Sequence, residues 1–310
     1  MKTLVKTLIL FSICNVLMVR AMAQEKTLKL ISYNVYWGMK QDTTENKAKF
    51  AEWIRQQDPD ILALQEMNGF TQENPDFVGF GDGNVNKNNL QKLAASYGHP
   101  YVYIVREPFS NGMVSFPVAI TSKYPIVNVQ RVVENCAHGF IVAEIEGKHF
   151  VVTHLHPFSS EKRGYEMDQI LATIKSKGNN KKWLLMGDLN SVSPLDKEAY
   201  NDNLLRDFIR EDKKKRPHNE NLKDNELDYS IQQRILDTGF IDALKVFHPD
   251  FVATAPTKLF YDQSNYPLRY DYLYVSENMK KDMVDCKVIK DEFTDIYSDH
   301  YPVMLIYKNN

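Results

Sequence analysis

The sequence predicts an α/β fold in which two packed sheets carry helices on their outer faces. Apolar runs of four to eight residues, rich in Val, Ile, Leu and Tyr, recur along the chain between turn residues. Segments with helical periodicity separate many of these runs. Many strands with interspersed helices favour two layers of sheet covered by helices. The 310 residues are 43% hydrophobic and 25% charged, which is typical of a globular protein.

The first 23 residues are typical of a signal peptide and predict a secreted or periplasmic protein. Lys2 and Lys6 give a positive start, residues 8–19 are an apolar run, and Ala21-Met22-Ala23 is a small-residue cleavage site. A membrane anchor is the alternative. It is disfavoured because a helix needs about 20 apolar residues to span a bilayer, and Arg20 ends this run earlier.

The chain that remains after processing is acidic. The segment removed holds three of the 38 basic residues and none of the 40 acidic ones, so the mature chain carries a formal charge of −5. A protein that grips nucleic acid through its phosphates normally has a basic excess. The charge therefore disfavours a dedicated DNA enzyme, although a local basic cluster would escape this argument.

The apolar pattern assigns the remaining elements in order. Strands are predicted at residues 28–33, 61–64, 101–105, 118–121, 140–145, 150–153, 183–186, 270–275 and 303–307. Helices are predicted at residues 44–57, 88–97, 164–176 and 197–211. The turn Asp58-Pro59-Asp60 ends the first helix before the next strand.

These elements predict one domain, residues 24–310, with a polar and helical insertion near 196–230. Residues 212–227 are expected to be the least structured stretch, and the basic run 213–216 to be a solvated loop rather than a phosphate-binding patch. Cys136 and Cys286 remain after processing. Export permits a disulfide between them, and two buried thiols are the alternative.

A polar side chain ends or interrupts an apolar strand at six places, and this pattern predicts the functional site. A buried carboxylate in an apolar strand is costly unless it is paired or binds a metal. Each position alone is weak evidence, whereas one polar site at which the strand ends converge explains all of them. The residues concerned are Asn34, Glu66, His154, Asp188 with Asn190, Asp271, and Asp299 with His300.

This set resembles the endonuclease/exonuclease/phosphatase superfamily, which includes deoxyribonuclease I, apurinic endonucleases, bacterial sphingomyelinases and inositol-polyphosphate phosphatases. The resemblance implies a four-layer α-β-β-α sandwich of two mixed sheets, with the site at one end of both sheets. The matching segments, in the family's order, are Ser32-Tyr33-Asn34, Leu64-Gln65-Glu66, Thr153-His154-Leu155, Gly187-Asp188-Leu189-Asn190, Arg269-Tyr270-Asp271-Tyr272 and Ser298-Asp299-His300.

The same resemblance implies a divalent cation. Glu66 is the first candidate ligand, assisted by Asn34, with Asp299 as the third. Mg²⁺ prefers such carboxylate and amide oxygens. Mn²⁺ and Ca²⁺ are alternatives among which the sequence does not choose.

Catalytic roles follow by resemblance as well. His300 resembles the histidine that activates water or contacts the phosphate, and Asp271 the acid that hydrogen-bonds its imidazole. Asp188 and Asn190 would orient the attacking water and hold a phosphate oxygen. His154 resembles a second histidine that donates to a phosphate oxygen or protonates the leaving group.

Two further assignments have structural alternatives. Glu107 resembles a glutamate that supports the second histidine, and a plain surface charge is the alternative. Arg269 lies two residues before Asp271, so on a strand both side chains point to the same face. Arg269 would therefore either help bind the phosphate or form a structural ion pair with a nearby acid.

We therefore expect a monomeric, metal-dependent hydrolase of phosphodiesters or phosphomonoesters. The acidic charge favours a small or lipid-derived substrate. A nonspecific secreted nuclease is the alternative. A non-catalytic binding protein of the same fold is a third hypothesis, disfavoured because every principal position holds the expected residue type.

Overall fold

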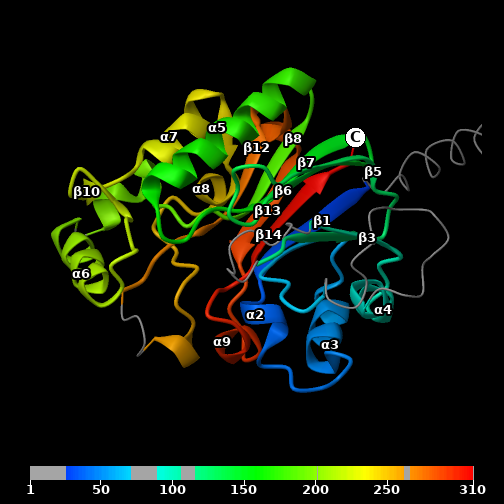
Figure 1. The fold of residues 1–310 in the computed structure, drawn as a ribbon. Coiled ribbons are helices and arrows are strands. Elements are labelled where there is room, and N and C mark those ends of the chain that lie inside the picture. The colour runs from blue at the N-terminus through cyan, green and yellow to red at the C-terminus, as the bar shows by residue number, and fades with distance from the viewer. Residues whose placement is uncertain (1–25, 71–88, 106–115, 201, 262–265, 310) are drawn as a thin grey trace, which may run out of the picture.

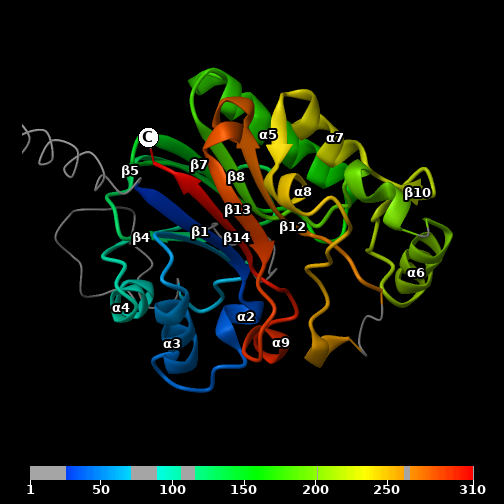
Figure 2. The ribbon, with the colours of Figure 1, turned by 180° about the vertical axis from the view of Figure 1, so that it is seen from behind.

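The structure is a computed structural model that describes residues 26–70, 89–105, 116–200, 202–261 and 266–309. Two six-stranded sheets pack face to face, and helices cover the outer face of each (Figure 1). The view from behind shows the same layers (Figure 2). The predicted four-layer α/β sandwich is confirmed. The predicted signal peptide lies outside the described residues.

The first sheet has the strand order β13-β14-β1-β2-β4-β3. Only its β1–β2 pair is parallel, so the sheet is mixed. Its strands are β1 (Thr27–Asn34), β2 (Ile61–Gln65), β3 (Tyr101–Ile104), β4 (Ala119–Ser122), β13 (Met283–Val288) and β14 (Val303–Lys308).

The second sheet has the order β11-β12-β8-β7-β6-β5, and only its β7–β8 pair is parallel. Its strands are β5 (Val127–Val132), β6 (Phe140–Ile145), β7 (Lys148–His154), β8 (Trp183–Asp188), β11 (Phe240–Asp242) and β12 (Asp271–Ser276). A separate hairpin pairs β9 (Leu222–Lys223) with β10 (Glu226–Leu227).

The helices form the outer layers. Buried apolar side chains of α3 (Ala48–Gln57) and α4 (Asn89–Ser96) pack on the first sheet. Those of α5 (Ser160–Lys177) and α7 (Ser230–Asp237) pack on the second sheet. The α6 helix and the β9–β10 hairpin form one end of the molecule (Figure 1). The α-helices are α2 (Tyr36–Met39), α3 (Ala48–Gln57), α4 (Asn89–Ser96), α5 (Ser160–Lys177), α6 (Asp202–Lys215), α7 (Ser230–Asp237), α8 (Ala243–Phe247) and α9 (Thr294–Tyr297), and the 3-10 helices are η1 (Pro194–Ala199), η2 (Lys258–Phe260) and η3 (Glu277–Asp282).

The alternation of side chains along each strand decides which face of a sheet they enter. Leu28 and Leu30 of β1 pack between the sheets, whereas Ile31 and Tyr33 pack under the helices. Strands buried on both faces read as nearly continuous apolar runs, and for that reason the central strands are visible in the sequence.

The structure contains elements that the sequence analysis did not predict. The sequence analysis missed β5, β11 and β13, which lie at sheet edges or carry polar side chains that alternate with apolar ones. It also missed α7. Residues 212–227 are more regular than expected, because they include the last turn of α6 and the whole β9–β10 hairpin.

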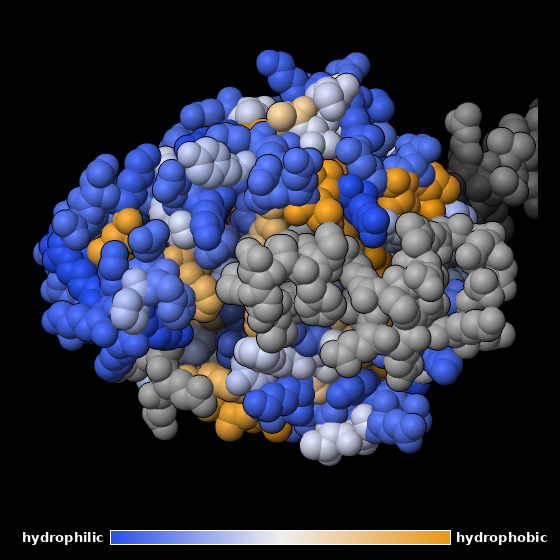
Figure 3. Space-filling view, in the orientation of Figure 1, coloured by the Kyte–Doolittle hydropathy of each residue, from blue (hydrophilic) through white to orange (hydrophobic). Residues whose placement is uncertain are grey.

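Cys136 and Cys286 belong to different core clusters, on opposite faces of the second sheet, so no disulfide joins them. Figure 3 shows that the described part of one face is mainly hydrophilic, with hydrophobic side chains in separate patches. Among the described residues, no helix is both long enough and apolar enough to cross a membrane.

Candidate active site

Four of the predicted site residues point into the space between the sheets. Asn34, His154, Asp188 and Asp271 share their strand face with side chains of the inter-sheet core, such as Leu30, and lie where that core ends. All four are buried. The strand pattern therefore directs them to one end of the core, as the sequence predicted.

The register of the second sheet then brings three of them side by side. His154 of β7 pairs with Asp188 of β8, and Asp188 pairs with Asp271 of β12. Gly187 allows this close pairing of β7 and β8. Its φ is 145°, and a Cβ there would lie 1.9 Å from the Thr153 carbonyl oxygen. Only glycine fits that position without moving a strand.

His300 reaches the same place from the first sheet. Its Nδ1 lies 2.8 Å from Asp271 Oδ2 and 3.8 Å from Asp188 Oδ2. The Ser298 hydroxyl donates to the Asn34 carbonyl at 2.6 Å and accepts from the His300 amide, which ties this segment to β1. The predicted Asp271–His300 pair is therefore present in the structure.

The surrounding charges determine the protonation of His300. Burial alone would lower its pKa, but the carboxylates of Asp271, Asp188 and Asp299 outweigh burial and raise the pKa well above its ordinary value. Burial raises the pKa of Asp188 to about 7, and Asp271 adds to the shift. His300 is thus held as a cation beside a carboxyl group that titrates near neutral pH.

Glu66 and Asn34 form the side of the site that belongs to the first sheet. The Asn34 side-chain amide donates to Glu66 Oε1 at 3.2 Å and to Asp188 Oδ2 at 3.1 Å. Glu66 has a left-handed φ of 61°, which breaks the alternation of β2, and its Oε2 accepts the Trp37 amide at 2.9 Å. Burial and the nearby charge of Asp299 raise the pKa of Glu66 to about 7.

These residues fit a divalent cation. The carboxylates of Glu66 and Asp299 lie close enough to repel each other, and burial raises the pKa of Asp299 as well. Asn34 adds an amide oxygen. Such hard oxygen donors suit Mg²⁺, Mn²⁺ or Ca²⁺. Ligand atoms of Asp188, Asp271 and His300 also lie within 4.8 Å of one another, but His300 Nδ1 is already engaged by Asp271.

Asn190 lies at the end of β8 in a left-handed conformation, with φ 45°. Its backbone amide donates to Asp188 Oδ1 at 2.8 Å, and its side-chain amide donates to the Leu155 carbonyl at 3.0 Å. These bonds position Asp188 and join β8 to β7. The predicted contact of Asn190 with a phosphate oxygen stays a prediction.

His154 faces Asp188 from the other side, with its Nε2 3.6 Å from Asp188 Oδ2. Its Nδ1 is buried and has no hydrogen-bond partner among the described residues. Burial and the nearby imidazoles lower its pKa well below the ordinary value. A neutral imidazole is therefore aimed at the centre. Glu107, predicted to support it, lies outside the described residues.

The sequence analysis missed His138, which stacks on His154 with ring centroids 4.4 Å apart. Its Nδ1 accepts the Phe116 amide at 3.3 Å, and burial lowers its pKa to about 3. His138 lies two residues before β6, and β6 pairs with β7 so that Phe140 faces Thr153. This strand pairing, which the sequence pattern does not report, brings the two imidazoles together.

Arg269 corrects a prediction. It was a candidate phosphate ligand, but its guanidinium is buried and bonds Asp196 and Asp242, each at 2.6 Å. The guanidinium also lies over the Tyr272 ring, 4.4 Å from its centroid. Two carboxylates satisfy this cation, so Arg269 forms the structural ion pair that the sequence analysis also offered, and it does not bind the phosphate.

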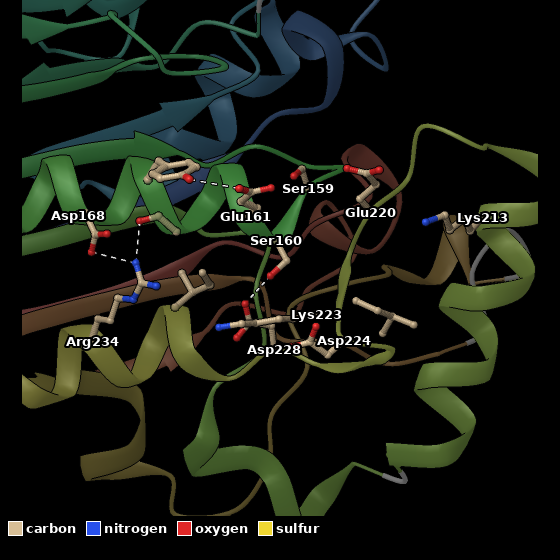
Figure 4. Close-up of a pocket in the computed structure, with 14 residues that line it drawn as sticks. Ser159, Ser160, Glu161, Asp168, Lys213, Glu220, Lys223, Asp224, Asp228 and Arg234 are labelled. Atoms are coloured by element: carbon tan, nitrogen blue, oxygen red, sulfur yellow. Dashed lines mark hydrogen bonds and ion pairs between the residues drawn. The ribbon is translucent and has the colours of Figure 1, made fainter.

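A cavity of about 510 Å³ lies elsewhere, between α5, α7 and the β9–β10 hairpin (Figure 4). Charged and polar side chains such as Ser160, Asp228 and Arg234 line it, and Ser160 donates to Asp228. None of the predicted site residues lines this cavity. The candidate site therefore lies apart from it.

Comparison with known proteins gives a family. A model of the Endonuclease/Exonuclease/phosphatase family matches residues 31–300, whereas no curated protein matches. An AP endonuclease from Archaeoglobus fulgidus is 20% identical, covering 90% of this chain and 99% of its own, with a TM-score of 0.62. A 3'-5' exonuclease from Neisseria meningitidis is 18% identical, covering 91% and 100%, with a TM-score of 0.60.

A 3' phosphatase from Neisseria, solved with a product DNA hairpin, is also similar. It is 17% identical, covers 91% of this chain and 99% of its own, and has a TM-score of 0.59. At such identities the structures establish the shared fold, and the family match covers the entire candidate site. The chain belongs to the Endonuclease/Exonuclease/phosphatase family, whose members are divalent-metal-dependent phosphoric ester hydrolases.

Proposed function

We propose that this protein hydrolyses a small or lipid-derived phosphodiester or phosphomonoester by in-line attack of water. The observation that carries the proposal is the Asp188 carboxylate, which lies within 4 Å of both His154 and His300 and accepts the Asn34 amide. A divalent cation held by Glu66, Asn34 and Asp299 would act as a Lewis acid on the phosphate.

The proton chemistry follows from the environments of the side chains. Asp188, with a pKa of about 7, is suited to take a proton from the attacking water near neutral pH. The cationic His300, held by Asp271, is suited to bind a phosphate oxygen whose charge grows during the reaction. The neutral His154 is suited to donate a hydrogen bond to a second phosphate oxygen or to the leaving group.

The acidic charge of the predicted mature chain, −5, supports a small substrate over duplex nucleic acid. The second candidate function is that of a nuclease, because solved structures with this fold include an AP endonuclease and an exonuclease. The predicted signal peptide supports action outside the cytoplasm.

Hydrolysis of bis-p-nitrophenyl phosphate, with Mg²⁺ and then with EDTA, tests the proposal. Turnover that requires the metal is the expected result. No turnover with Mg²⁺, Mn²⁺ or Ca²⁺ would favour a binding protein of this fold instead. A panel of plasmid DNA, RNA, sphingomyelin, lysophospholipids and nucleotide phosphates then separates the substrate classes, and a strong preference for plasmid DNA would favour the nuclease.

A further inference from the structure

A row of aromatic rings connects the protein surface to the reacting centre. The Trp37 indole meets the Phe116 ring edge-on at 4.7 Å, and Phe116 meets His138 at 5.3 Å. His138 stacks on His154, whose Nε2 lies 3.6 Å from Asp188. Trp37 is therefore the outermost ring of a contiguous wall that ends at the catalytic carboxylate.

Trp37 is unusual among the three tryptophans of this protein. It is 47% exposed, whereas Trp53 is 4% exposed and Trp183 is fully buried. A tryptophan carries a large apolar surface that is normally buried or placed at an interface. Its Phe116 neighbour meets it at an interplanar angle of 79°, and nearly half of the Trp37 side chain stays exposed beside this contact.

Hydrogen bonds fix the backbone that carries this exposed ring. The Trp37 amide donates to Glu66 Oε2, and the Gly38 amide donates to the Glu66 carbonyl at 2.6 Å. Tyr36 and Trp37 both adopt left-handed φ angles, 51° and 50°, and a Cβ at Gly38 would lie 2.0 Å from the Asn68 carbonyl oxygen. Strained residues of this kind persist where the surroundings determine them and are concentrated at functional sites.

We propose that Trp37 is a specificity-determining residue that stacks on a flat ring of the substrate, of the kind found in a nucleobase. The inference rests on the proposed phosphoesterase function. A single rigid indole face suits a planar group, because stacking on an aromatic side chain needs one face only. A quaternary ammonium group is bound instead by an aromatic cage of several faces.

Three diesters with a common p-nitrophenolate leaving group test the proposal: those of thymidine, choline and methanol. In wild type with Mg²⁺, the thymidine ester should exceed the methyl ester in kcat/KM by about 10- to 100-fold, the scale of stacking one base. Trp37→Ala should remove most of this preference through KM, and Trp37→Phe should restore part of it. Tyr165→Ala is the matched control, since Tyr165 is 60% exposed and lies on α5.

Equal losses for all three esters in Trp37→Ala would overturn the proposal, as would a choline preference that depends on Trp37. A short oligothymidylate in the same assay distinguishes a free nucleoside ester from the end of a nucleic acid. Preference for either source, dependent on Trp37, supports a base as the stacked group.

Fluorescence keeps this test separate from the test of catalysis. Because Trp53 and Trp183 are buried, quenching by thymidine 5'-monophosphate should come from Trp37 and disappear in Trp37→Phe, and methyl phosphate should quench little. If wild type cleaves no diester, the proposed function fails while this titration still decides the role of Trp37. Quenching that persists in Trp37→Phe, or none in wild type, would overturn it.

Discussion

Two buried histidines approach Asp188 from opposite sheets and are held in opposite protonation states. His300 precedes β14 of the first sheet and is surrounded by carboxylates, which raise its pKa despite burial. His154 ends β7 of the second sheet and stacks on another imidazole, and its burial lowers its pKa. The two rings lie at similar distances from Asp188, 3.8 and 3.6 Å. Neighbouring groups, rather than residue type, therefore give each ring its chemistry.

Replacing Asp188 or the cationic His300 should lower activity more than any other change proposed here. Asp188→Asn and His300→Ala should each lower kcat by about 10²–10⁴, the scale of a positioned acid or base. The measurement is metal-dependent hydrolysis of bis-p-nitrophenyl phosphate, with thermal unfolding as a check on folding and Tyr165→Ala as the control. Near-normal activity of His300→Ala would show that the role proposed for His300 is wrong.

Loss of the proposed metal ligand should come next. Glu66→Gln removes one negative charge while keeping the size of the side chain, so the Mg²⁺ concentration for half-maximal activity should rise. The rise should exceed the roughly 10- to 100-fold typical of residues that only support a ligand. An unchanged Mg²⁺ requirement would move the cation to the Asp188, Asp271 and His300 group.

Loss of His138, which stacks on the neutral His154, should lower kcat/KM by a smaller factor. His138→Ala removes the ring that stacks on His154, and stacked aromatic pairs contribute about 0.5–1.5 kcal/mol, so kcat/KM should fall by about 2- to 10-fold. His138→Phe keeps a ring and should lose less. The two variants acting alike would indicate that the imidazole nitrogens of His138, rather than its stacking, support His154.

Glu66 should also make the free energy of unfolding, measured in EDTA, modestly dependent on pH. Glu66, with its pKa raised to about 7, binds more protons folded than unfolded between its ordinary pKa and 7. Its contribution to the free energy of unfolding therefore falls as pH rises through that window. The five histidines whose pKa burial lowers oppose this trend below their ordinary pKa.

The comparison of wild type with Glu66→Gln in urea unfolding isolates this contribution. Wild type should lose stability relative to Glu66→Gln between pH 5 and pH 7.5, and saturating Mg²⁺ should reverse the trend, since a metal ligand must be deprotonated. A constant difference between the two proteins across this range would contradict the raised pKa of Glu66.

The sequence predicted the site residues that lie at strand ends better than those that act through contacts between distant segments. Asn34 and Asp188 end buried strands and Asp271 begins one, so their positions can be read from the apolar pattern. The roles of His138 and Trp37 depend on ring contacts between segments far apart in the chain, and no local pattern reports such contacts. Arg269 was ambiguous because its partners, Asp196 and Asp242, lie 73 and 27 residues away.

Gly187 has a consequence for how the enzyme tolerates mutation. A single methyl group there would act as a wedge between β7 and β8, because the Thr153 carbonyl occupies the space. Gly187→Ala touches neither water nor phosphate, yet it would spread His154 and Asp188 apart. The enzyme is therefore vulnerable at a position without any side chain, where the smallest enlargement breaks the pairing of His154 with Asp188.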